Sequence, residues 1–246
     1  MNPFLWRSLL LTSPAAVVLM AMLGITSLIL SFVPKGGAAQ YAFSRWCARM
    51  LLRVGGVRVK AEGLEELNPG AVYVFASNHA SLMDPPVLTA HLPIQFRYLA
   101  KKELFRVPFL GMHLRSSGHL AVDRSDARAG LRSMSDAART MRDKGISVLV
   151  FPEGSRTGGE LKDFKEGAAY IALKAGLPVV PVALSGTHQI LSPGRLLIRP
   201  GEVLLRVAEP ISTLGMTLKD RARLTELLHR RVADLMAGPP EEASAI

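Results

Sequence analysis

A histidine and an aspartate stand five positions apart in the segment ASNHASLMDPP (76–86), directly after the apolar run AVYVFA. Five residues of helix would leave the side chains of His79 and Asp84 about 140° apart, so they can meet only if the chain turns between them. In a strand-to-helix loop, Asp84 could hold one imidazole nitrogen while the other accepts a proton from a hydroxyl. The alternative is that Asp84 caps a helix starting at Pro85, and the pair alone favours this alternative.

Two polar residues beside the pair, Asn78 and Ser81, are predicted to support this loop. Ser81 lies two residues from His79, so we expect its hydroxyl to make a loop hydrogen bond; an enzyme nucleophile is the alternative. Without that nucleophile, His79 and Asp84 amount to two-thirds of a serine-hydrolase triad. The attacking group would then be a hydroxyl of the substrate itself.

More polar residues follow three other predicted strands. Taken singly, each is most often part of a surface turn or a solvated charge. Basic side chains at several strand ends instead suggest a phosphate-binding pocket, and a glutamate and an arginine around a flexible glycine can bind a polar substrate or aim backbone N–H groups at an oxyanion. The residues are Lys101 and Lys102 after FRYLA, Arg124 after GHLAVD, and Glu153, Gly154, Ser155 and Arg156 after SVLVFP.

The chain beyond about residue 55 alternates short apolar runs with helical patterns. Several runs are continuously apolar, as strands buried on both faces are. The alternation predicts an α/β fold with a mostly parallel, twisted sheet flanked by helices, a terminal hairpin as antiparallel edge, and ligands at the C-terminal strand ends. Strands are expected at 57–61, 71–76, 96–100, 119–124, 147–152, 179–184, 196–199 and 203–207, and the clearest helices from Ala127 to Gly145, near 166–175 and over 217–238.

The composition narrows the class of protein. Hydrophobic residues at 49% and charged residues at 20% are ordinary for a globular chain, while the net charge of +10 indicates a polyanion, an anionic lipid surface or a phosphorylated substrate as partner. The single Cys47 rules out an internal disulfide, and the six histidines show no metal-ligand spacing, so we expect no metal site. Nucleic-acid binding is disfavoured because the basic residues are not interleaved with aromatic ones.

An apolar segment near the N-terminus predicts membrane attachment. Residues 8–33 carry no charge, and the nineteen residues after Pro14 would span about 28 Å as a helix, close to the thickness of a bilayer core. A cleaved signal peptide is the alternative, with small residues at 36–39 in its favour. The helix either spans the bilayer or dips into it as half of a hairpin, and the sequence leaves both open.

The next segment has an amphipathic helical pattern. Arg45, Arg49 and Arg53 recur every four residues, and Trp46 lies on the opposite side with other apolar residues. The pattern suits a helix in the headgroup layer; a helix packed on the core is the alternative. Since more positive charges follow the apolar segment than precede it, we expect the rest of the chain to face the cytoplasm from the inner membrane.

The four polar segments, in this order, resemble the motifs of the glycerolipid acyltransferase family, whose best-known members are the lysophosphatidic acid (1-acyl-sn-glycerol-3-phosphate) acyltransferases. The likeness runs from about residue 70 to 211. NHASLMD resembles the first motif, KKELFRVPFLG with GHLAVDR the second, FPEGSRT the third and VVPVAL around Pro181 the fourth. Ser155 stands where the family often has threonine, and LAVDR replaces the commoner Phe-Ile-Asp-Arg.

The resemblance implies a role for each group. His79 would be the general base that deprotonates a free glycerol hydroxyl, and Asp84 would orient it. The hydroxyl would attack the thioester of acyl-CoA or acyl carrier protein as co-substrate, with no further cofactor. Binding of the acceptor is implied for Glu153, Gly154, Ser155 and Arg156, binding of its phosphate for Lys101 or Lys102 with Arg124, and shaping of the acyl-chain side for Pro181.

Two other functions stay open from the sequence. One is the same chemistry on a different acceptor, such as a lyso-ornithine lipid, another lysophospholipid or glycerol-3-phosphate. The other is a non-catalytic protein that binds anionic lipid at the membrane surface. In every case we expect membrane-anchoring helices in residues 1–55, an α/β domain in 56–238 and a flexible tail in 239–246.

Overall fold

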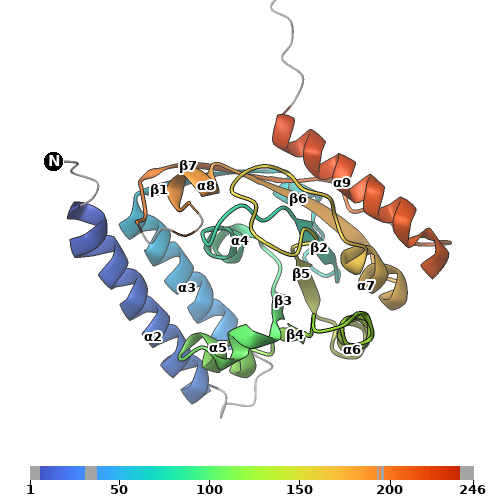
Figure 1. The fold of residues 1–246 in the computed structure, drawn as a ribbon, viewed down its shortest axis with the longest axis horizontal. Coiled ribbons are helices and arrows are strands. Elements are labelled where there is room, and N and C mark those ends of the chain that lie inside the picture. The colour runs from blue at the N-terminus through green and yellow to red at the C-terminus, as the bar shows by residue number, and fades with distance from the viewer. Residues whose placement is uncertain (1–5, 31–37, 193, 195–196, 239–246) are drawn as a thin grey trace, which may run out of the picture.

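The computed structural model describes residues 6–30, 38–192, 194 and 197–238 of the chain (Figure 1). Within these residues, seven strands form one sheet in the order β1-β7-β6-β2-β5-β3-β4. All neighbouring strands run parallel except β6 and β7. The prediction of an α/β fold with a mostly parallel sheet is therefore confirmed. The strands are β1 (Val57–Glu62), β2 (Val74–Ser77), β3 (Phe96–Lys101), β4 (Leu120–Val122), β5 (Ser147–Val150), β6 (Val179–Ser185) and β7 (Gly201–Val207).

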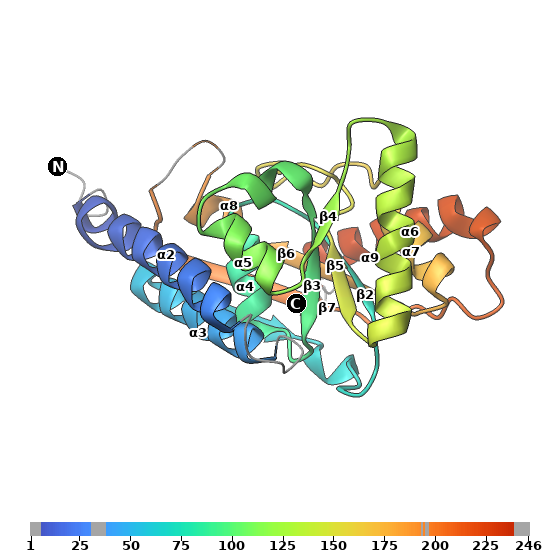
Figure 2. The same cartoon turned by 90° about the horizontal axis from the view of Figure 1, so that it is seen from below.

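Helices cover both faces of the sheet, as Figures 1 and 2 show. Helices α3 and α4 pack on one face, with α2 and α5 outside them, and α6, α7 and α9 pack on the other. Two covered faces explain why the central strands β2, β5 and β6 are almost continuously buried. The bounds are α2 (Ser13–Leu30), α3 (Ala38–Gly55), α4 (Asp84–His91), α5 (Leu110–Ser116), α6 (Ala127–Lys144), α7 (Gly167–Ala175), α8 (Thr187–Ile190) and α9 (Arg221–Ala237), with short π or 3-10 turns η1 (Ser8–Thr12), η2 (Leu64–Glu66), η3 (Lys102–Arg106) and η4 (Leu218–Asp220).

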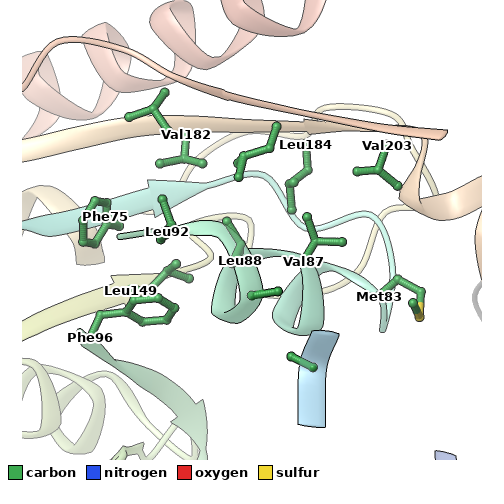
Figure 3. Close-up of a cluster of buried hydrophobic side chains, with 14 of the residues drawn as sticks. Phe75, Met83, Val87, Leu88, Leu92, Phe96, Leu149, Val182, Leu184 and Val203 are labelled. Carbon is green, nitrogen blue, oxygen red and sulfur yellow. The ribbon is translucent and has the colours of Figure 1, made fainter. Parts of the chain in front are cut away.

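The two hydrophobic cores alternate along each central strand. Phe75 of β2 lies in the core beneath α4 (Figure 3), whereas its neighbours Val74 and Ala76 lie in the core beneath α6 and α7. Leu149 and Val148 of β5 divide in the same way. Successive strand residues point to opposite faces, so one slip in register would reverse every contact. The cores thereby fix the ends of β2 and β5, where the polar motifs begin.

The predicted terminal hairpin is wrong. Residues 197–199 are not in a strand, and residue 196 lies outside the described residues. Strand β7 instead lies between β6, with which it is antiparallel, and β1, with which it is parallel. The edges of the sheet are β1 and β4. Pairing of β7 with a strand about 144 residues earlier buries the alternate side chains Val203, Leu205 and Val207, which a two-stranded hairpin would leave half covered.

The N-terminal helices form a pair on the outside of the domain. Among the described residues, one segment, Ser8–Ile29, is long and apolar enough to cross a membrane, with a mean hydropathy of 2.0 and 11% burial. A core helix would be mostly buried, so the segment indicates membrane association; a signal sequence has the same composition. The small residues at 36 and 37 that favoured cleavage, and the predicted tail 239–246, lie outside the described residues.

Helix α3 packs one of its faces on the α/β domain. A helix packed on the core was the alternative to a helix in the headgroup layer. Its buried residues include Ser44, Cys47 and Leu52, and it lies against α4 and β1. Trp46 remains 45% exposed on the outer side. The helix therefore joins the α/β domain to the apolar α2 and still presents an aromatic side chain outward.

Candidate active site

The loop between β2 and α4 brings His79 and Asp84 into contact. Helix α4 begins at Asp84 itself, so the prediction that Asp84 is an N-cap before Pro85 is wrong by one position. Its carboxylate turns back into the loop, where Oδ2 accepts from His79 Nδ1 at 2.7 Å and from the N–H groups of Ala80 at 2.7 Å and Ser81 at 2.8 Å. Asp84 is fully buried. One oxygen thus holds both the loop backbone and the imidazole.

The imidazole of His79 is oriented for proton transfer. Because the carboxylate of Asp84 can only accept, Nδ1 of His79 carries the proton and Nε2 keeps its lone pair. The ring stacks on Phe151 with 3.9 Å between centroids and a 16° angle between planes. Its side chain is 17% exposed, so the histidine is reachable from outside but held on two sides. This is the arrangement that a general base requires.

The motif after β5 clamps the backbone of His79. Oε1 of Glu153 accepts from the His79 N–H at 2.6 Å, and the Thr157 N–H donates to the His79 carbonyl at 2.9 Å. Oε2 of Glu153 accepts from the Lys162 N–H at 3.2 Å. Burial raises the pKa of Glu153 despite these hydrogen bonds. Both carboxylate oxygens accept from backbone N–H groups, so Glu153 positions the loop that carries His79, a role that the sequence did not indicate.

Asn78 and Ser81 tie the loop to β6 and the chain beyond it. The amide of Asn78 donates to the Leu184 carbonyl at 2.9 Å and accepts from the Leu184 N–H at 2.8 Å. The hydroxyl of Ser81 donates to the Leu191 carbonyl at 2.6 Å and accepts from the Met83 N–H at 3.1 Å. Ser81 is fully buried, and its proton is committed to a backbone carbonyl. It stabilises the loop and is not placed as a nucleophile.

A cavity of about 460 Å³ lies beside the histidine, under the C-terminal ends of β3, β4 and β5. Phe151 belongs to its wall and also stacks on His79, so the cavity and the base share a side chain. Its other wall residues are largely apolar, such as Leu99, Val122 and Met134. An apolar cavity with a few polar groups, next to a general base, is the usual form of a small-molecule site.

Three cations line the cavity, together with the carboxylates of Asp123, Asp126 and Glu166. Arg124 was predicted, and its guanidinium donates to the Gly154 carbonyl. Lys165 and Arg221 were not predicted, because they lie in helical or loop sequence far from any strand end. Lys165 reaches over Gly154, where a Cβ would come within 3.0 Å of its Nζ. Arg221 pairs with Glu166 at 2.6 Å. Arg124 and Lys165 therefore offer positive charge to an anion in the cavity.

The remaining predicted cations lie differently. Lys102 pairs with Asp123 at 2.8 Å, and its ammonium group holds the pKa of Asp123 at about 2. Lys101 is exposed and lies 3.6 Å from Glu103. Ser155 and Arg156 are exposed and are not among the described residues that line the cavity. The structure thus brings Arg124 to the cavity but neutralises Lys102.

Two further predicted positions are structural in this geometry. The N–H of Gly154 donates to the Phe151 carbonyl at 3.1 Å, so this N–H group is engaged within the turn. Gly154 has φ of 78°, a left-handed turn that glycine adopts without strain. Pro181 is buried in β6 beside Ala76 of β2. Among the described residues, no group of three or more His, Cys, Asp or Glu side chains is placed to hold a metal ion.

Comparison with known proteins agrees with this site. The Acyltransferase family model matches residues 58–185. A 1-acyl-sn-glycerol-3-phosphate acyltransferase of Limnanthes alba is 34% identical over 71% of this chain and 62% of its own, and one of Borreliella burgdorferi is 28% identical over 78% and 77%. This chain spans less than two-thirds of the length of the plant relatives from Limnanthes alba, Limnanthes douglasii and Cocos nucifera.

A solved structure extends the similarity to the whole fold. The 1-acyl-sn-glycerophosphate (LPA) acyltransferase PlsC from Thermotoga maritima superposes with a TM-score of 0.76 at 26% identity, covering 96% of this chain and 98% of its own. The matched family segment begins in β1 and ends in β6, and it contains both the His79 loop and the Glu153 turn. The chain belongs to the acyltransferase family.

Proposed function

We propose that the protein is a 1-acyl-sn-glycerol-3-phosphate acyltransferase. It moves a fatty acyl group from acyl-CoA or acyl carrier protein to the free sn-2 hydroxyl of lysophosphatidic acid and forms phosphatidic acid. The contact between His79 Nδ1 and the buried Asp84 carboxylate, next to a cavity lined by Arg124, carries the proposal. The activities named for the relatives support the same substrate class.

The proton moves through His79. Nε2 takes the proton of the acceptor hydroxyl as its oxygen attacks the thioester carbonyl carbon. The tetrahedral intermediate collapses, the C–S bond breaks, and the protonated imidazole returns its proton to the thiolate. Asp84 keeps Nδ1 protonated throughout and stabilises the imidazolium that forms in between. The enzyme itself forms no covalent intermediate, consistent with the buried and committed hydroxyl of Ser81.

The acceptor phosphate binds at the cationic side of the cavity. Arg124 presents a planar guanidinium that suits the bidentate geometry of a phosphate, and Lys165 adds a second charge above Gly154. Lys102 contributes less, because Asp123 already pairs with it. Roles in acceptor binding for Lys101, Glu153, Gly154, Ser155 and Arg156, and a role in acyl-chain shape for Pro181, stay predictions.

Membrane attachment serves this substrate, which stays at the bilayer. The apolar α2 supplies the anchor, and basic residues near an anionic surface add about 1 kcal/mol each. We place the catalytic domain on the cytoplasmic side of the inner membrane, from the charges that follow the apolar segment. The division into an anchor in residues 1–55 and a catalytic domain in 56–238 belongs to the same proposal.

The decisive experiment removes the base. Membranes carrying His79→Ala should lose acyl transfer by about 10³-fold or more, measured as release of free CoA with a panel of lyso-acceptors. The matched control is His229→Ala on α9, whose ring contacts Phe164 away from the loop. Full activity of His79→Ala would end the acyltransferase proposal. Acylation of lyso-ornithine lipid without acylation of lysophosphatidic acid would change the acceptor, and vesicle binding without turnover would indicate a lipid-binding protein.

A further inference from the structure

A second exposed apolar surface lies beside α2. The outer side of α2 exposes large side chains such as Val17 at 70% and Ile29 at 62%. The segment that follows β3 adds Leu104 at 40%, Val107 at 42% and Phe109 at 40%. Single exposed apolar residues are ordinary on a protein surface, but a contiguous group marks a binding surface. We call residues 104–109 the insertion loop.

The insertion loop is joined to α2 by close contacts. A Cβ on Gly24 of α2 would lie 2.5 Å from the carbonyl oxygen of Phe109, so the two backbones nearly touch. Oγ of Ser27 on α2 lies 2.8 Å from Nδ1 of His113 on α5, and both side chains are buried. Helix α5 begins at Leu110, directly after the loop. The apolar surface of the loop therefore continues that of α2.

Positive charge surrounds the insertion loop. Residues 101–116 contain four lysines and arginines and one glutamate, and one of the four, Lys102, pairs with Asp123. Lys101, Arg106 and Arg115 are exposed. Apolar side chains flanked by cations match a bilayer that contains anionic lipid, where the apolar groups enter the acyl region and the cations stay among the headgroups.

We propose that the insertion loop enters the same bilayer as α2 and forms a second membrane contact, beyond the anchor of the proposed function. The loop leaves β3 at Lys101, at the strand edge where His79 and Arg124 lie. Its insertion holds that edge at the level of the headgroups. A lipid acceptor then reaches the base without leaving the bilayer.

Depth-dependent quenching tests the contact directly in the full-length protein. Val107→Cys, labelled with an environment-sensitive fluorophore, should be quenched several-fold more by brominated acyl chains in vesicles containing phosphatidylglycerol than a label at Leu214→Cys. Leu214 is 93% exposed. It belongs to the segment between β7 and α9, and that segment lies on the side of the molecule away from α2 (Figures 1 and 2). The native Cys47 is buried, and burial raises the pKa of its thiol to about 11, so labelling is selective.

Equal quenching at the two positions would overturn the proposal. So would a Val107 label that lipid leaves unchanged and an acidic acyl carrier protein quenches, because the loop would then bind a protein. Neither outcome depends on enzymatic turnover, so a failure here is distinct from a failure of the proposed function.

A double variant tests the consequence. Leu104→Ser with Val107→Ser should weaken partitioning into the same vesicles about tenfold. It should leave the rate with a short-chain, monomeric acceptor unchanged and lower the rate with a vesicle-bound acceptor. Leu214→Ser is the matched control. Unchanged partitioning of the double variant would refute the insertion loop, and an equal loss with both acceptors would show a folding defect instead of a membrane contact.

Discussion

The catalytic loop (78–84) and the insertion loop (104–109) both follow parallel strands at one edge of the sheet, yet their surfaces are opposite. The catalytic loop buries polar side chains, and Asp84 Oδ2 alone accepts three hydrogen bonds. The insertion loop exposes Leu104, Val107 and Phe109, each to at least 40%. Buried polar groups need hydrogen-bond partners, whereas a contiguous group of exposed apolar side chains marks a surface that binds an apolar partner. The first loop is complete within the protein, and the second is completed by a bilayer.

Replacing Asp84 by Asn tests the first half of this comparison and should have the largest effect. The amide oxygen can still accept from His79 Nδ1, but the negative charge that stabilises the imidazolium is lost, so we expect kcat to fall by about 10²- to 10⁴-fold. Asp84 Oδ1 is buried and has no partner among the described residues, so an amide nitrogen there would be unsatisfied and cost about 1–3 kcal/mol of stability. Steady-state kinetics and thermal unfolding measure both, with the exposed Asp143→Asn as control. A fully active Asp84→Asn would show that the loop does not need its carboxylate.

Arg124→Ala tests the cationic side of the cavity next to the catalytic loop. Removing the guanidinium should raise KM for lysophosphatidic acid about 10- to 100-fold and change kcat less, since the side chain binds substrate and transition state alike. Arg124→Lys should recover part of this loss, because it keeps the charge but not the bidentate geometry. The control is Arg139→Ala, whose partner is the surface residue Asp136. A drop in kcat alone would instead assign Arg124 to the transition state, through its contact with the Gly154 carbonyl.

The sequence predicted the parts of this site that depend on local order. The contact between His79 and Asp84 followed from a turn after a buried strand, and Arg124 from its place at a strand end. The role of Glu153 did not follow, because its partner, the His79 N–H, lies 74 residues earlier. The neutralisation of Lys102 by Asp123 depends in the same way on the pairing of β3 with β4. Long-range pairing also explains why the predicted hairpin was wrong and β7 joined β1 instead.

Gly24→Ala tests whether the close contact between α2 and Phe109 fixes the position of the insertion loop. The added methyl would meet the backbone of Phe109 and force α2 away from α5, so we expect a loss of about 1–3 kcal/mol in stability. Gly130→Ala on α6 is the control, since its Cβ would lie 3.4 Å from the Asp123 carbonyl, and alanine favours a helix. Thermal unfolding in detergent measures both. If Gly24→Ala is as stable as its parent, α2 is not held by this contact, and the insertion loop moves independently of it.

Glu153→Gln should change stability the least of these variants. It tests whether burial of Glu153 beside the catalytic loop favours the protonated carboxyl. Burial raises the pKa of Glu153, so the protonated carboxyl is favoured in the folded state. Its contribution to stability is therefore present below the ordinary glutamate range and is lost as the pH rises through the raised pKa. The variant lacks this titration, so its stability relative to the parent should increase from pH 4 to pH 8.

The informative quantity is the slope, against pH, of the stability difference between Glu153→Gln and its parent. The glutamine amide would face the Lys162 N–H, and this repulsion shifts the whole curve by an amount that does not depend on pH. Thermal midpoints across the pH range, with the exposed Glu160→Gln as control, separate the slope from the offset. A slope of opposite sign would mean that the hydrogen bonds from the His79 and Lys162 backbone outweigh desolvation. The ionised form of Glu153 would then be stabilised by these hydrogen bonds. The catalytic loop would in that case lie beside two negative charges, those of Asp84 and Glu153.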